Sequence, residues 1–182
     1  ASLTGVTVTN TGGLSMSGTA LGNAVTFAGG TGADAIQVGA TTQDLTMGAG
    51  NDTVIYTAVA GTSGTVAGGG GTDTVSMTFA LANAADASGA FNTSHTSFEA
   101  LTISDALSGA LDVDALQDAT TIIAPGDTTG GTLNNLDSGS SVQQNVSNTG
   151  TFTINVDGAV ASSSDVLNMS FLNAATALGT VV

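Results

Sequence analysis

The sequence of 182 residues predicts an all-β protein, a right-handed parallel β-solenoid. Three observations predict this fold. A glycine-rich turn that ends in an aspartate occurs three times, the spacing of the copies fits stacked coils, and short apolar strands recur after them. The composition agrees, because 26 glycines, a single proline and only 4% aromatic residues suit thin coils with tight turns and uninterrupted strand ladders.

The repeated turns lie within residues 29–77 and follow the pattern G-G-x-G-x-D-x-U-x, in which U is aliphatic. The three copies are 29–36, 48–54 and 68–75, and their turns end with Asp34, Asp52 and Asp73. This nonapeptide is typical of calcium-binding parallel β-rolls. One copy would be weak evidence, since Gly-x-Gly-x-Asp is common in loops, but three copies in one register are strong evidence.

The spacing of the aspartates predicts how the coils stack. Asp34 and Asp52 are 18 residues apart, which is two nonapeptides, so a nonapeptide without the aspartate turn is expected between them at 38–46. Asp52 and Asp73 are 21 residues apart, which predicts a bulge of about three residues near 56–58. Successive nonapeptides of a roll alternate between its two edges, so the aspartate turns should lie above one another.

The turns supply the ligands that calcium prefers. Calcium binds six to eight oxygens, and it accepts main-chain carbonyls beside carboxylates. Glycines allow positive φ and let several carbonyls point inward. We expect one ion between the first and second turns and another between the second and third, with ligands from Gly30, Gly32, Asp34, Gly48, Gly50, Asp52, Gly69, Gly71 and Asp73. The alternative, ordinary turns without metal, is disfavoured because stacked aspartates repel one another.

The charge of the chain leads to the same expectation. It has no lysine and no arginine against 14 acidic residues, a formal net charge of −14. Divalent cations are the natural counterions, since self-repulsion otherwise opposes the compact state. The charge argues against nucleic acid as a partner, and against direct binding to an anionic membrane unless calcium bridges the two.

The sequence predicts one continuous domain in three parts. Residues 1–78 hold a first strand and the calcium β-roll, 79–100 form a loop excursion with a helical turn near 80–87, and 101–182 continue as a less regular β-helix. In the last part, strand positions recur every ten to eleven residues, a spacing that a sandwich also shows. A solenoid is simpler, because the roll provides an edge to stack upon. The recurring positions are Leu101, Leu111, Ile122, Leu133, Val142 and Phe152.

Three further carboxylates are weaker candidates for calcium binding. Asp112 and Asp114 flank Val113 and would point to one face of a strand, where a solvated face is an equally good interpretation. Glu99 is the only glutamate and lies beside the predicted core, so it needs calcium or backbone amides as a partner.

No motif in the sequence predicts an enzyme. His95 is the only histidine and no nucleophile motif accompanies it, so we expect a histidine on the surface or in a turn. A zinc site would need more nitrogen or sulfur ligands than one histidine and no cysteine provide. The glycine runs lack the Lys-Ser/Thr ending of a phosphate-binding loop.

Several phrases of the sequence, taken in order, resemble a known family. Residues 6–10 (VTVTN), 27–34 (FAGGTGAD), 47–54 (MGAGNDTV), 98–102 (FEALT) and 164–169 (SDVLNM) resemble segments of Caulobacter-type surface-layer (S-layer) proteins. The likeness is dense in the first half and sparse over 105–160. The nonapeptides alone are shared by all RTX exoproteins, so the order of the flanking phrases is the more specific signal.

The resemblance implies a secreted, type-I-exported structural protein at the cell surface, where calcium drives assembly of identical copies into a two-dimensional lattice. It implies calcium ligation at the aspartates of the three turns. Lipopolysaccharide anchoring in that family uses a separate domain that this chain does not show, so we expect a piece of a longer exported protein without membrane insertion. Met47 in place of glycine and Asn51 before Asp52 depart from the pattern but remove no carbonyl. The alternative is an RTX module of a secreted enzyme, toxin or adhesin, although enzymes of that kind tend to end soon after the roll.

Overall fold

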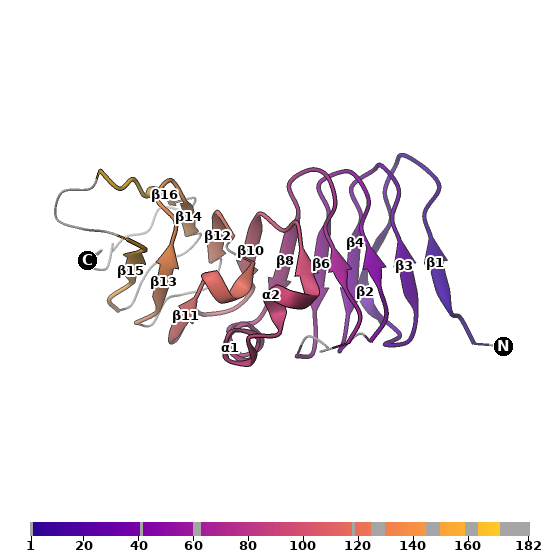
Figure 1. Ribbon diagram of the computed structural model, residues 1–182, viewed down its shortest axis with the longest axis horizontal. Helices are drawn as coiled ribbons and strands as arrows, with labels where there is room; N and C mark the ends of the chain where they lie inside the picture. Colours follow the sequence, from indigo (N-terminus) through magenta and orange to yellow (C-terminus); the bar gives the residue numbers. More distant parts are fainter. Residues whose placement is uncertain are drawn as a thin grey trace.

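The predicted parallel β-solenoid is confirmed. A computed structural model describes residues 2–40, 42–59, 63–117, 119–124, 130–144, 150–158 and 164–171. Its strands form three sheets in which every recorded pairing is parallel. The coils follow one another along the long axis, so β1 and β16 lie toward opposite ends (Figure 1).

One wall of the solenoid is a single sheet that runs through the described chain. Its order follows the sequence, with each even-numbered strand beside the next. The eight strands are β2 (Ser15–Leu21), β4 (Ala35–Val38), β6 (Thr53–Tyr56), β8 (Thr74–Met77), β10 (Ala100–Ile103), β12 (Thr121–Ala124), β14 (Ser141–Gln144) and β16 (Asn168–Phe171).

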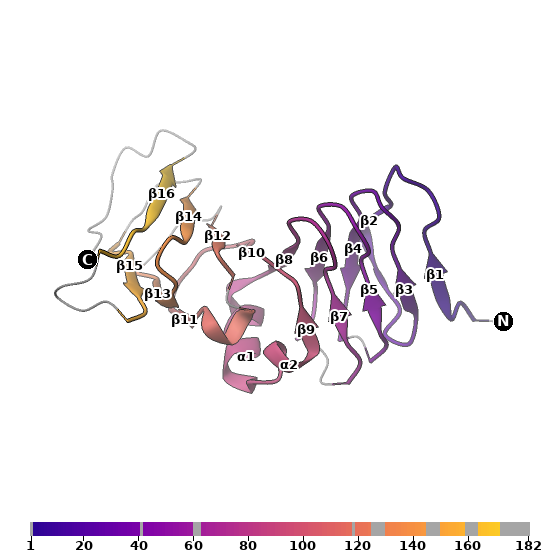
Figure 2. The ribbon, with the colours of Figure 1, turned by 45° about the horizontal axis from the view of Figure 1, so that its top comes forward.

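The opposite wall changes sheets midway. The first sheet comprises β1 (Gly5–Thr7), β3 (Thr26–Ala28), β5 (Leu45–Thr46), β7 (Val66–Ala67) and β9 (His95–Thr96). The second comprises β11 (Ala110–Asp112), β13 (Thr132–Leu136) and β15 (Thr153–Val156). Three helices lie where one sheet gives way to the other: α1 (Phe79–Ser88), α2 (Phe91–Ser94) and the 3-10 helix η1 (Asp114–Leu116) (Figure 2).

The registers explain the two different spacings of the aspartates. Tyr56 pairs with Val38, 18 residues earlier, whereas Val66 pairs with Leu45, 21 residues earlier. The three extra residues therefore fall between Tyr56 and Val66, a longer stretch than the predicted bulge at 56–58, and 60–62 lie outside the described residues. The nonapeptide without an aspartate turn forms β5, as its spacing predicts.

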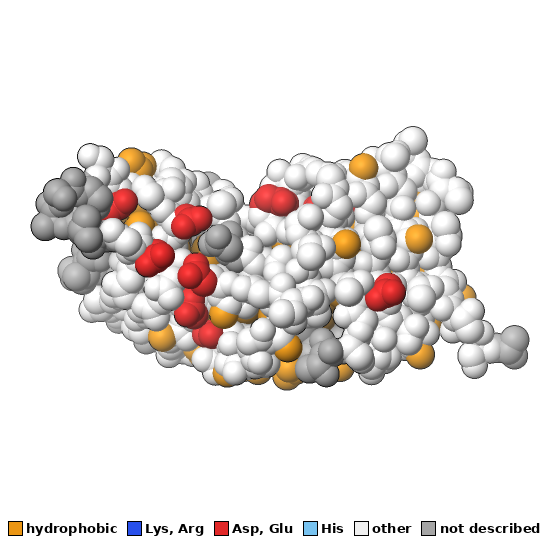
Figure 3. All heavy atoms as spheres, viewed as in Figure 1, with side chains coloured by type: hydrophobic (Ala, Val, Ile, Leu, Met, Phe, Trp, Pro, Cys, Tyr) orange, Lys and Arg blue, Asp and Glu red, His pale blue; other side chains and the backbone are white. Residues whose placement is uncertain are grey.

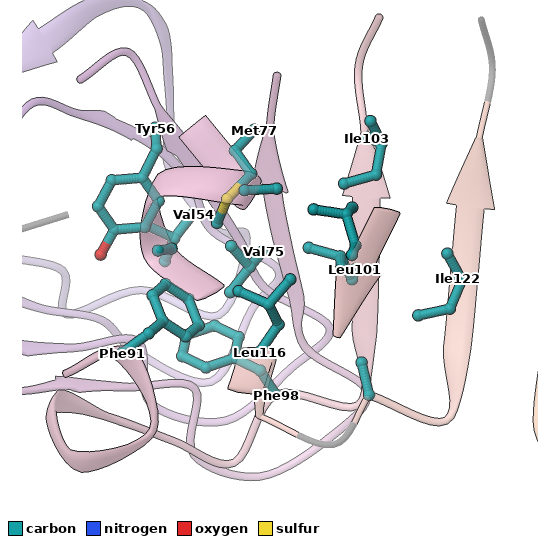
Figure 4. Packing of buried hydrophobic residues seen from close by; sticks show 14 of the residues in the cluster. Val54, Tyr56, Val75, Met77, Phe91, Phe98, Leu101, Ile103, Leu116 and Ile122 are labelled. Carbon is teal, nitrogen blue, oxygen red and sulfur yellow. The ribbon is translucent and has the colours of Figure 1, made fainter. Parts of the chain in front are cut away.

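Each strand sends alternate side chains into the core. In the continuous sheet, one buried aliphatic residue from each of the strands β4 to β14 lies directly above the next, and Figure 4 labels Val54, Val75, Leu101 and Ile122 among them. Burying such a side chain contributes roughly 1.5–3 kcal/mol. This column, aligned by the strand registers, is Ile36, Val54, Val75, Leu101, Ile122 and Val142.

The excursion after β8 contains the predicted helical turn as a helix of ten residues, α1. Thr78 caps it by accepting a hydrogen bond from the Leu81 N–H at 3.4 Å, and Gly89 ends it with φ 61°. Ala82 and Ala85 are buried, and the helix contacts η1 and β11. It therefore covers the place where the second wall changes sheets. Among the described residues, no helix is long and apolar enough to cross a membrane.

The prediction of a surface or turn position for His95 is wrong. Its side chain is 1% exposed and stacks on Phe91, with ring centroids 3.8 Å apart and planes inclined by 12°. Its Nε2 is hydrogen-bonded to the Tyr56 hydroxyl, and its Nδ1 lies 2.9 Å from Ser94 Oγ. β9 pairs with β7, so His95 takes the inward position above Val66. Helix α2 then places an aromatic ring against the imidazole.

Candidate cation site

Four acidic residues of successive coils form a column at one edge of the solenoid, here termed the acidic ladder. Its members are Asp34, Asp52, Asp73 and Glu99, each just before a strand of the continuous sheet. The Asp34 N–H donates to Asp52 Oδ1 at 2.7 Å, the Asp52 N–H to Asp73 Oδ1 at 2.8 Å, and the Asp73 N–H to Glu99 Oε2 at 2.8 Å. Below them, the Leu14 N–H donates to Asp34 Oδ1 at 2.5 Å. Each carboxylate is therefore fixed by the main chain of the coil beneath it.

The three aspartates of the ladder are buried, and two of them are only partly satisfied. In Asp34 the second oxygen, Oδ2, accepts a hydrogen bond from the Gly30 N–H at 3.3 Å. Asp34 is 1% exposed, and Asp52 and Asp73 are fully buried. Among the described residues, the Oδ2 atoms of Asp52 and Asp73 have no hydrogen-bond partner. Burial raises the pKa of both groups, and neighbouring carboxylates raise it further, while the hydrogen bond from the backbone opposes the shift. The structure thus leaves acceptor oxygens in the interior without a donor.

The energies favour an added positive charge. Two unit charges one strand spacing apart, about 4.8 Å, repel by roughly 3 kcal/mol at an effective dielectric constant of about 20. A hydrogen bond to a charged group contributes only about 1.5–3 kcal/mol, and an unsatisfied buried acceptor costs about 1–3 kcal/mol. The amide hydrogen bonds therefore do not offset the repulsion and the orphaned oxygens together, so the ladder needs protons or a cation.

At two glycines the absence of a side chain lets oxygens of the ladder approach the main chain closely. A Cβ on Gly29 would lie 1.8 Å from the Met47 carbonyl oxygen and 2.6 Å from Asp34 Oδ2. A Cβ on Gly68 would lie 1.9 Å from the Ser97 carbonyl oxygen and 2.8 Å from an aspartate oxygen, Asp73 Oδ2. In each case a carbonyl from one coil and a carboxylate from the coil before it approach the same point. These first-position glycines were not among the predicted site residues.

The predicted ligand glycines stack closely in the structure. Gly48, Gly50, Gly69 and Gly71 have positive φ, as predicted, whereas Gly30 and Gly32 do not. The first turn needs glycine for close approach instead, because a Cβ on Gly32 would lie 2.4 Å from the Thr11 carbonyl oxygen.

Main-chain hydrogen bonds tie the turns together. The Ala49 N–H donates to the Gly30 carbonyl at 2.9 Å, and the Gly70 N–H donates to the Gly48 carbonyl at 2.9 Å. Carbonyl oxygens are therefore concentrated along the ladder, and each has a second lone pair.

These carbonyl and carboxylate oxygens fit a hard divalent cation, which takes only oxygen ligands. Across the described residues, no three carboxylate, imidazole or thiol groups converge on one point, so an ion here would take main-chain carbonyls together with few carboxylates. Calcium tolerates such mixed and irregular shells. The middle coil differs, because Met47 occupies the position of Gly29 and Gly68, and its side chain is fully buried in the core.

The two weaker aspartate candidates, Asp112 and Asp114, lie in different elements. Asp112 ends β11, where its Oδ2 accepts a hydrogen bond from Asn135 Nδ2 at 3.1 Å and its buried Oδ1 has no partner. Asp114 is exposed and begins η1, because the chain turns helical at Val113. The prediction that Asp112 and Asp114 share a strand face is therefore wrong. A further carboxylate, Asp86 of α1, was not predicted, and its Oδ2 accepts a hydrogen bond from the Asp112 N–H at 3.0 Å.

Comparison with protein-family models and with curated protein sequences finds no match for this chain.

Proposed function

We propose that this chain is a structural β-solenoid that folds on binding calcium and assembles with its own copies into a surface-layer lattice outside the cell. The observation that carries the proposal is the acidic ladder. It holds two buried carboxylate oxygens without a partner, in a chain that has no lysine or arginine to neutralise them. Because the chain has no such side chain to neutralise them, a cation from solution is the natural partner of these carboxylates at neutral pH.

The oxygen ligands of the acidic ladder favour calcium over the other common cations. The ladder offers carboxylate and carbonyl oxygens from separate coils, and no described imidazole or thiol is near enough to make a zinc-type cluster. Magnesium requires near-ideal octahedral geometry and gives up its waters reluctantly. Calcium is also abundant outside cells, where modules with modest affinity bind it.

The lattice part of the proposal is supported by sequence resemblance, by shape and by charge. The coils form an elongated body with exposed acidic side chains, many of them over strands β11 to β15 (Figure 3). Two such bodies repel each other unless divalent ions screen or bridge them. The second candidate, an RTX module of an exported enzyme, toxin or adhesin, is supported by the nonapeptides, which that class shares. It is disfavoured by the four further strands of the continuous sheet that follow the last nonapeptide.

The test of the calcium site is Asp52→Asn. The amide keeps an oxygen for the Asp34 N–H but removes the charge, so we expect calcium affinity to fall at least about tenfold. Titration calorimetry of the metal-free protein measures the affinity. Asp44→Asn is the matched control, because it removes the same charge from an exposed side chain that accepts from the Thr65 N–H on the opposite edge.

Equal affinities in Asp52→Asn and the wild type would contradict the assigned site. A calorimetric titration without any heat of calcium binding would contradict the calcium proposal altogether. Light scattering of the same samples tests assembly: we expect scattering to rise on calcium addition, and folding without any rise would contradict lattice formation by this chain.

A further inference from the structure

The acidic ladder does not end with the last nonapeptide. The turn that follows it in the stack is 97–99, Ser-Phe-Glu, which matches no glycine motif. Glu99 nevertheless occupies the next step, since its Oε2 accepts the Asp73 N–H at 2.8 Å, the same distance at which Asp73 Oδ1 accepts the Asp52 N–H. The Ala100 N–H donates to the Asp73 carbonyl at 3.0 Å, as the Thr74 N–H donates to the Asp52 carbonyl at 2.8 Å. The Glu99 N–H departs from the pattern of the aspartates, because it donates to the same Asp73 carbonyl at 3.1 Å.

This turn also reproduces the close approach of a carbonyl oxygen that is found at the first coil. The Ser97 carbonyl oxygen lies 1.9 Å from a Cβ built on Gly68, where the Met47 carbonyl oxygen lies 1.8 Å from a Cβ built on Gly29. Ser97 has φ 60°, a left-handed conformation that non-glycine residues rarely adopt. The backbone at Ser97 thus holds a strained conformation at the point where its carbonyl reaches the ladder.

A buried carboxylate oxygen indicates that a ligand belongs at this step of the ladder. Asp73 is fully buried, and its Oδ2 has no hydrogen-bond partner. That oxygen lies 2.8 Å from the Cβ position of Gly68, beside the Ser97 carbonyl. Glu99 is half-buried and brings a second carboxylate to the same step of the ladder.

We propose that Asp73, Glu99 and the Ser97 carbonyl oxygen hold a divalent cation, of the calcium type, at a third site beyond those predicted from the nonapeptides. This inference rests on the proposed calcium-dependent fold and extends it past the sequence motif. The site joins the β-roll to the coil of β10, directly after the excursion through α1 and α2. An ion here would fix the return of the chain to the continuous sheet.

The experiment counts ions by native mass spectrometry of the full chain at saturating calcium. We expect Glu99→Gln, which keeps an oxygen for the Asp73 N–H but loses the charge, to bind one calcium fewer than the wild type. Asp44→Asn, which removes an exposed carboxylate away from the ladder, should bind the wild-type number. Glu99→Asp keeps the charge and shortens the side chain, so it should retain the ion with affinity weakened about tenfold or more.

The outcomes separate this inference from the proposed function. If the wild type binds calcium and Glu99→Gln binds the same number of ions with equal affinity, the third site is overturned and the calcium-dependent fold stands. If Glu99→Gln does not fold, unchanged affinity in Glu99→Asp overturns the site in the same way. A wild-type chain that binds no calcium overturns the site and the proposed function together.

Discussion

A buried carboxylate without a partner is the feature of single residues on which the account depends. The pKa of Asp52 and of Asp73 is raised by burial, so the metal-free folded state holds protons that an unfolded chain would release. In the absence of metal, the stability that protonation contributes is full below the unfolded pKa of 3.8, and it is lost as the pH rises through the raised pKa.

Calcium and protons should therefore compete for the ladder. We predict that calcium binding releases protons at a mildly acidic pH, where aspartates with an ordinary pKa are already ionised. Titration calorimetry in two buffers of different ionisation enthalpy measures the release. Asp52→Asn should release fewer protons, and a binding heat that does not depend on the buffer would contradict the prediction.

Glycine is required at some positions of the turns and not at others. Gly71 has φ 138°, and a Cβ there would lie 1.8 Å from the Gly50 carbonyl oxygen. We predict that Gly71→Ala lowers the free energy of unfolding in calcium by at least about 2 kcal/mol, from backbone strain together with this clash. Chemical denaturation measures the change.

The neighbouring Gly70 is the matched control for Gly71→Ala. Nothing lies within 4 Å of its Cβ position, and its φ is not positive. Gly70→Ala should therefore change the free energy of unfolding by no more than about 0.5 kcal/mol. Equal effects of the two substitutions would contradict the described turn geometry.

The roles of some single residues could not be predicted from the sequence. The motif identified Asp34, Asp52 and Asp73 because each ends a glycine-rich turn of the same pattern. It did not identify the first-position glycines, since their role depends on a carbonyl of the next coil. The burial of His95 was missed for a related reason: its ring partner Phe91 comes from a helix, and its inward position comes from the pairing of β9 with β7.

Among the elements, α2 and β9 place a titratable group in the core. Burial lowers the pKa of His95 from 6.5 to about 4, so the folded state excludes a proton that the unfolded chain accepts. Stability contributed by the neutral imidazole is thus present above pH 6.5 and is lost as the pH falls toward about 4. The full loss is on the order of 3 kcal/mol.

The variant His95→Gln isolates this effect, because glutamine can keep a hydrogen bond to the Tyr56 hydroxyl and does not titrate. We predict that its free energy of unfolding, measured at saturating calcium, falls less steeply than that of the wild type between pH 6.5 and 4. The contribution of the acidic ladder cancels in the difference between the two proteins. Parallel pH profiles would contradict a buried neutral His95.

At the same scale, strands were more predictable than helices. β6 and β8 begin and end where the alternating apolar residues place them, and β10 to β14 contain the recurring apolar positions, whereas Phe152 lies just before β15. Helix η1 was not predicted, because Asp112 to Asp114 alternate with Val113 as in a strand and only the packing of α1 and α2 against η1 favours a turn there. The alternation of apolar and polar residues indicates which face of a strand is buried. It does not indicate where a helix from another part of the chain will cover the wall.

The whole molecule combines one uninterrupted sheet with a net charge of −14. Its aliphatic column stabilises the stack coil by coil, and nearest-neighbour contacts of this kind make a solenoid sensitive to the state of each turn. The acidic ladder runs along the same stack at one edge. Neutralising the ladder would therefore act on several coils at once, which is why we propose that a cation governs the folding of the roll.

Circular dichroism of the wild-type chain at neutral pH, in chelator and then at calcium concentrations up to millimolar, tests this claim most directly. Magnesium at the same concentrations is the control. We predict that the metal-free chain lacks much of the β signal and that calcium restores it, whereas magnesium does not. A chain that shows the same spectrum and the same thermal unfolding in chelator as in calcium would contradict the account.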